Sequence, residues 1–136
     1  TEAGIIPFYS EANTVDLFGL NTKKFAKNPA GGAYINKTYF DILIIHTGQY
    51  GTDCNSIKKL FNETKNINKK NVIDRNSTWT EFTFQLFSGI NQDLYKIFIL
   101  PIYKKNNHVF LFFNKNSINF EALSIIAKKN AIECKF

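Results

Sequence analysis

The chain has 136 residues, of which 44% are hydrophobic and 15% aromatic, so it can build the core of one ordinary domain. This composition excludes a disordered chain, and no stretch reaches the roughly 20 apolar residues that a membrane-spanning helix requires. The net charge of +6 comes from scattered lysines, with Arg75 as the only arginine. That pattern favours solubility, or weak attraction to an anionic membrane face, over specific nucleic-acid binding.

The first third of the chain predicts short elements separated by loops. Residues 14–18 form a strand candidate, and Asn21 or Thr22 can cap a short helix through Ala26, because a side-chain oxygen accepts an orphan backbone N–H. Residues 28–32 carry Asn, Pro and three small residues, which predict a loop.

The strongest predicted strand spans residues 40–46. Its consecutive apolar residues are typical of a strand covered on both faces, as in a parallel sheet. The strand ends at His46, and strand ends in α/β sheets are where ligands bind. The alternative is a histidine with a purely structural role.

An amphipathic helix follows, capped by Thr52 or Asp53 and ending near Lys65. Its inward stripe, which points Cys54 toward the core, contains Cys54, Ile57, Phe61 and Thr64.

The C-terminal half predicts three strands, a turn and a helix. Residues 80–86 alternate apolar and polar residues, and residues 95–103 and 108–113 are apolar runs joined by a turn with an Asn pair. Pro101 predicts a bulge or an edge in its strand.

The last predicted helix begins at Ser117 or Asn119 and ends where Asn130 adopts a left-handed conformation. Residues 131–136 are then a short tail or an edge strand. The predicted inward stripe of this helix contains Phe120, Leu123, Ile126 and Ala127.

We therefore expect an α/β fold: one domain over residues 1–136 with helices packed on a mixed β-sheet. Its N-terminal part is expected to be parallel and its C-terminal part an antiparallel meander. Cys54 and Cys134 allow one disulfide if the two helices beside them lie on the same side of the sheet, whereas two buried thiols are the alternative.

The sequence carries no self-contained catalytic motif. A Gly-x-Ser-x-Gly elbow, a Walker loop and a dinucleotide-binding glycine motif are absent, and no cysteine–histidine cluster indicates a metal or another cofactor. Glu2 and Asp16 flank the first segments and could converge in space. A small basic nuclease would need His46 or His108 beside an acid and a lysine, which the sequence does not favour.

Three segments of the first third resemble one family: residues 2–10 (EAGIIPFYS), 15–21 (VDLFGLN) and 24–26 (KFA). In this order they resemble a pattern in the C-terminal soluble domains of polytopic membrane glycosyltransferases of the GT-C type. These enzymes use sugars linked to dolichyl or polyprenyl phosphate. Phe8 stands where the pattern has its first Tyr, and Thr22 stands where an acid is common.

The resemblance implies an extracytoplasmic domain, periplasmic or at the cell surface, that is tethered to the membrane in the full-length protein. The catalytic acids would lie in the membrane domain of the same polypeptide, so this chain would be an excised, non-catalytic piece that positions an acceptor glycan or the lipid-linked sugar. The candidate binding residues are Glu2, Tyr9, Asp16, Asn21 and His46. The alternative function is that of a small secreted or periplasmic binding protein, such as an immunity-type inhibitor.

Overall fold

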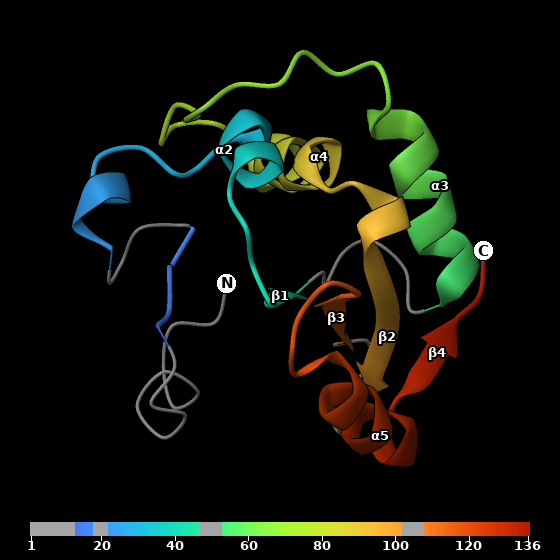
Figure 1. Cartoon of the computed structure of the whole chain (residues 1–136). Helices are drawn as coiled ribbons and strands as arrows, with labels where there is room; N and C mark the ends of the chain where they lie inside the picture. Colours follow the sequence, from blue (N-terminus) through green and yellow to red (C-terminus); the bar gives the residue numbers. More distant parts are fainter. Residues whose placement is uncertain (1–12, 18–21, 47–52, 102–107) are drawn as a thin grey trace.

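Figure 1 shows the computed structural model of the chain, which describes residues 13–17, 22–46, 53–101 and 108–136. Four strands and several helices are described, and the short 3-10 helices are labelled η. In chain order the elements are η1 (Lys23–Phe25), α2 (Gly32–Lys37), β1 (Ile42–His46), α3 (Cys54–Thr64), α4 (Trp79–Gly89), η2 (Gln92–Leu94), β2 (Tyr95–Pro101), β3 (His108–Asn114), α5 (Phe120–Asn130) and β4 (Ile132–Cys134).

The described strands form one sheet in the order β1-β3-β2-β4, and each described pair is antiparallel. The predicted α/β domain with helices packed on a sheet is confirmed, as is the antiparallel pairing of β2 with β3. The parallel pairing predicted for the N-terminal part is wrong for β1, which lies at the sheet edge and runs antiparallel to β3. Only Leu43 and Ile45 of this strand are buried, so its apolar run does not reflect equal cover on both faces.

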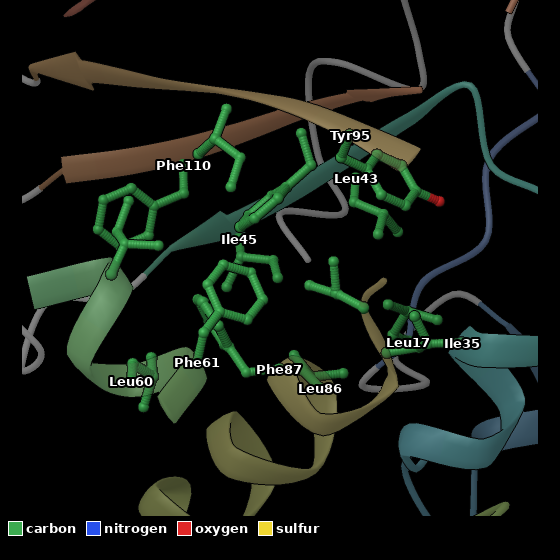
Figure 2. Packing of buried hydrophobic residues seen from close by; sticks show 14 of the residues in the cluster. Leu17, Ile35, Leu43, Ile45, Leu60, Phe61, Leu86, Phe87, Tyr95 and Phe110 are labelled. Carbon is green, nitrogen blue, oxygen red and sulfur yellow. The ribbon is translucent and has the colours of Figure 1, made fainter. Parts of the chain in front are cut away.

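Helices α3 and α4 cover one face of the sheet, and three phenylalanine rings join them to it. The ring centroids of Phe61 on α3 and Phe87 on α4 lie 5.1 Å apart, and those of Phe87 and Phe112 on β3 lie 5.8 Å apart. Figure 2 shows Phe61 and Phe87 pointing from their helices toward the sheet, in which β1 carries Leu43 and Ile45. Such edge-to-face pairs each add roughly 0.5–1.5 kcal/mol beyond the area they bury.

Helix α5 covers the opposite face, so the sheet is the middle of three layers (Figure 1). Phe98 and Phe113 meet beneath α5, with ring centroids 5.3 Å apart, and Ala127 is buried against them. Ile126, predicted to be inward, is 62% exposed, because the face that meets the sheet is centred on Ala127 and Ser124 instead.

The chain leaves α5 without the predicted left-handed stop. Asn130 is the last helical residue, and Ala131 follows in an extended conformation and leads directly into β4. The edge strand predicted for the tail is therefore confirmed as β4. Because β4 pairs only with residues 97–99 of β2, no described strand lies beside Pro101 on that side, which agrees with the predicted edge there.

Helix α4 replaces the strand predicted at residues 80–86, and this prediction is wrong. Thr78 caps the helix by accepting a hydrogen bond from the backbone N–H of Glu81, within the Thr-x-x-Glu sequence pattern that is typical of helix starts. Phe82 and Leu86 are both buried, and their spacing of four residues fits one helical face as well as it fits alternation in a strand. The hydrogen bond of the cap therefore distinguishes the 3.6-residue period of a helix from the two-residue period of a strand.

The strand predicted at residues 14–18 is also not found, since its described residues are irregular. Leu17 is buried, and its carbonyl accepts a 2.8 Å hydrogen bond from the N–H of Ala30. This single hydrogen bond links the segment to the loop at residues 28–32, but it does not form the series of backbone hydrogen bonds found between paired strands. The short helix predicted after Thr22 is confirmed as η1, a 3-10 helix. The predicted side-chain cap is wrong for Thr22, which makes no capping hydrogen bond to η1, and Asn21 lies outside the described residues.

Residues 28–32, predicted to be a loop, end in the first residue of α2. A Cβ built on Gly89 would lie 2.2 Å from the carbonyl oxygen of Gly32, so α2 and α4 cross in backbone contact. Gln85 strengthens this crossing, because its side-chain oxygen accepts from the N–H of Gly32 at 3.4 Å. The same oxygen accepts from the N–H of Lys70 at 3.1 Å, and the Gln85 amide donates to the carbonyl of Asn68 at 3.0 Å. The polar linker after α3 is thereby fixed to α4.

The predicted disulfide between Cys54 and Cys134 is confirmed, with the two Cα atoms 5.3 Å apart. Cys54 begins α3, and Asp53 caps that helix by accepting from the backbone N–H of Ser56. The condition attached to the prediction is wrong, since α3 and α5 lie on opposite sheet faces. The bond forms because β4 pairs beside β2 and directs Cys134 toward the α3 face.

Candidate functional site

The structure places two of the five predicted binding residues. Glu2, Tyr9 and Asn21 lie outside the described residues, so their prediction stays untested. Asp16 and His46 are described, and they lie on different parts of the fold.

Asp16 lies within the domain interior at 3% exposure. Its backbone N–H donates a 2.8 Å hydrogen bond to the hydroxyl of Thr22, the residue that precedes η1. This bond links the segment that contains Asp16 to the start of η1. Asp16 is buried and therefore contributes little exposed surface.

His46 is the last residue of β1 and is half-buried opposite Val109 of β3. The other end of β1 begins at Ile42, about 13 Å away at 3.3 Å per residue. Two recesses lie toward that other end, and His46 does not line them.

Two adjoining recesses lie where α2 and α4 end, and together we call them the amide groove. The first has a volume of about 460 Å³ and the second about 280 Å³. Asn36 at the end of α2 and Asn91 after α4 line both recesses. Because Gly32 and Gly89 bring the two helices into backbone contact, these two asparagines are held at fixed positions beside each other's helix.

The first recess has an apolar base and a polar rim. Phe61, Phe87 and Ile90 are all buried, and they are the same side chains that join the helices to the core. Lys65 at the end of α3 and Lys69 in the linker supply positive charge on the rim, and the other rim residues are Asn36, Asn91, Gln92 and Asp93.

The amide side chains of the groove differ in how many of their hydrogen-bonding groups already have partners within the protein. Within the described part of the chain, the side chains of Asn36 and Gln92 have no hydrogen-bond partner. The oxygen of Asn91 accepts from the N–H of Asp93 at 3.1 Å, which leaves its two amide hydrogens available. In contrast, Asn114 is buried and already bonds the Phe40 carbonyl and the chain after β3.

Two tyrosines line the second recess in their neutral form. Burial raises the pKa of Tyr95, and the charges on Tyr39 and Asp41 raise it further. The pKa of Tyr39 is also raised, first by loss of hydration and then by the Asp41 carboxylate, whose oxygen lies 3.3 Å from the Tyr39 hydroxyl. Tyr39 is 60% exposed, so its ring can contact a bound molecule.

The groove therefore presents amides, neutral phenols, the three ammonium groups of Lys37, Lys65 and Lys69, and one carboxylate above an apolar base. These groups can donate and accept hydrogen bonds to a polar molecule. Across residues 13–17, 22–46, 53–101 and 108–136, no group of three or more His, Cys, Asp or Glu side chains could hold a metal ion.

The sequence did not predict the amide groove, since its residues come from five separate segments. Asn36 and Asn91 are 55 positions apart and carry no motif. The crossing that brings them together depends on α4, which alternation had assigned as a strand. The Thr-x-x-Glu cap at Thr78 was the one signal that could have corrected that assignment.

No helix among the described residues is long and apolar enough to span a membrane. Residues 1–98 match the family described as Domain of unknown function (DUF8728), and the chain belongs to that family. No curated protein and no solved structure matches the chain. The matched segment contains all of the first recess, whereas α5 and β4 lie beyond it.

Proposed function

We propose that this member of a family of undefined function is an accessory extracytoplasmic domain of a membrane glycosyltransferase. It has no catalytic role of its own, and it holds an acceptor glycan or the sugar of a lipid-linked donor in the amide groove. The catalytic groups would lie in a membrane domain of the same polypeptide. The resemblance of residues 2–26 to the GT-C pattern supports this assignment of class.

The observation that carries the location is the disulfide between Cys54 and Cys134. Structural disulfides persist in secreted, periplasmic and surface proteins, whereas thiols in the cytosol are kept reduced. The bond joins α3 to the edge of the sheet, at two points 80 positions apart in sequence. A domain that is cross-linked by a disulfide is expected in an oxidising compartment.

The chemistry of the amide groove supports a sugar as its ligand. Each sugar hydroxyl both donates and accepts, and an amide side chain offers both functions in one plane. Asn36 and Gln92 supply such amides, and the exposed ring of Tyr39 offers an apolar surface for a sugar face. Lys65 and Lys69 add affinity for an acidic substituent.

The location and the parent protein are tested on the native polypeptide in its source cells. Intact cells are reduced, treated with a membrane-impermeant maleimide and probed with an antibody against residues 53–101. The proposal expects labelling of Cys54 and Cys134 in a membrane-bound polypeptide much larger than 15.6 kDa. A released protein close to that mass would overturn it and favour the secreted binding protein instead.

Ligand binding is tested on the purified chain by saturation-transfer NMR with neutral and acidic oligosaccharides. The N36A and N91A variants should lose most of the transferred signal. Asn62 is exposed on α3 and does not line the groove, so N62A is the matched control and should bind like the parent chain. Equal loss in all three variants, or no transfer to any oligosaccharide, would contradict a sugar site in the groove.

A further inference from the structure

The solvent face of α5 and the turn before it carry isoleucines that the fold does not use. Ile118 is 98% exposed, Ile125 57% and Ile126 62%, whereas the inward side of α5 packs on the sheet. Single exposed apolar residues are ordinary, but three within nine positions form a patch that signals an interaction.

The turn holds Ile118 outward in a defined position. The buried Ser117 donates its N–H to the carbonyl of Asn114 at 3.0 Å, and its hydroxyl accepts from the N–H of Asn119 at 3.2 Å. Its carbonyl accepts from the N–H of Phe120 at 3.1 Å. Ile118 therefore projects from a bonded turn at the start of α5.

Within α5, positions 122, 125 and 129 follow helical spacing, so the face that carries Ile125 continues along the helix and ends in lysine. Lys128 and Lys129 are exposed in the last turn, and Glu121 is the only acidic residue of the helix. Exposed isoleucines bordered by lysines are complementary to a partner surface with a negatively charged outer layer and an apolar interior.

We propose that this face of α5 rests on the surface of an anionic lipid bilayer. Ile118, Ile125 and Ile126 enter the boundary between headgroups and acyl chains, which an amphipathic helix reaches to a depth of roughly 5–10 Å. Lys128 and Lys129 extend their stems alongside and bind lipid phosphates. The contact does not depend on the glycosyltransferase assignment, since it uses only the exposed side chains of α5.

The geometry leaves the first recess of the amide groove clear of the bilayer. The helices that build the first recess, α3 and α4, lie on the sheet face opposite α5 (Figure 1). A domain seated on α5 could therefore bind a ligand and lipid at the same time.

The test is flotation of the oxidised 136-residue chain with vesicles. One set contains phosphatidylcholine alone, and the other contains equal parts of phosphatidylcholine and phosphatidylglycerol. The chain should float with the anionic vesicles. In the sample with neutral vesicles, it should stay in the bottom fraction while the vesicles float. The I118S/I125S/I126S variant should lose about 100-fold in partition coefficient, which corresponds to half-burial of each side chain.

Ile132 provides the matched control, because it is 59% exposed on β4 and lies outside the α5 face. The I132S variant should float like the parent chain. The K128Q/K129Q variant should lose about tenfold or more on anionic vesicles, at roughly 1 kcal/mol for each lysine near the surface. Thermal unfolding of all variants checks that each one is folded.

Three results would overturn the proposal. The parent chain could fail to float with anionic vesicles, or the triple isoleucine variant could float as well as the parent. The third is a parent chain that sediments as a dimer and a triple variant that sediments as a monomer, which would assign the patch to a second copy of the chain.

Discussion

Removal of the disulfide should lower the stability of the domain by several kcal/mol. The bond closes a loop across 80 positions, from Cys54 to Cys134. The loop-closure entropy of such a chain corresponds to about 4.5 kcal/mol at 25 °C, and measured losses for native disulfides are typically about 2–5 kcal/mol. The C54A/C134A variant should therefore unfold at a urea midpoint lower by about 1–3 M, with a slope near 1.5 kcal/mol/M.

The assay is equilibrium urea unfolding followed by far-ultraviolet circular dichroism. The slope of the transition should also increase, because an unfolded chain without the cross-link exposes more surface. The parent chain, reduced and alkylated, serves as the control and should match the double variant. A loss below about 1 kcal/mol in both samples would refute the entropic reasoning, since it would show that the cross-link barely restricts the unfolded chain.

Three smaller changes test the packing of α4 and the groove by the same urea assay. T78A removes the helix cap and should cost about 1 kcal/mol, whereas a neutral result would contradict this cap. G89A places a Cβ 2.2 Å from the Gly32 carbonyl and should cost about 3 kcal/mol or more, because two backbones must separate; a loss below about 1 kcal/mol would refute the close crossing. The raised pKa of Tyr95 makes the unfolded chain lose its phenolic proton first as the pH rises above about 10, so stability should fall there, and less steeply in Y95F. Equal pH dependence in Y95F and the parent would show that Tyr95 is not the group responsible.

The elements that the sequence predicted well are those with one dominant local signal. Helix α3 has an aspartate cap and a single apolar stripe, and the structure follows both. Strands β2 and β3 are long apolar runs separated by a few residues for which the sequence predicts a turn and which lie outside the described part of the chain, so their antiparallel pairing follows from chain connectivity. The disulfide required only that Cys54 face inward and that Cys134 lie in a tail near the sheet.

The predictions failed where two periods fit the same residues. In the segment of α4, Phe82, Phe84 and Leu86 alternate, but Phe82 and Leu86 also lie one helical turn apart. Phe84 is only half-buried, as expected for a residue to the side of a helical face. Only the cap at Thr78 distinguished the two structures, and that signal concerns backbone hydrogen bonds rather than hydrophobic periodicity.

The direction of β1 could not follow from its own residues. An apolar run indicates burial, but antiparallel pairing with β3 depends on a strand more than 60 positions later. The amide groove has the same character, because it exists only once α2 and α4 cross at their glycines. Residues that become neighbours through a crossing carry no shared spacing in sequence.

The disulfide and the amide groove lie at opposite ends of α3, which separates their roles. Cys54 begins this 11-residue helix, and Thr64 lines the groove at its last residue, about 15 Å away along the axis. The groove end of α3 is held by its own contact, since the ring of Phe61 packs on Phe87 and on Phe112 of the sheet. The aromatic core therefore determines the shape of the groove. The disulfide instead raises the free energy of unfolding, and so the fraction of chains that are folded. Under conditions where the reduced chain stays folded, a groove ligand should bind it as tightly as it binds the oxidised chain.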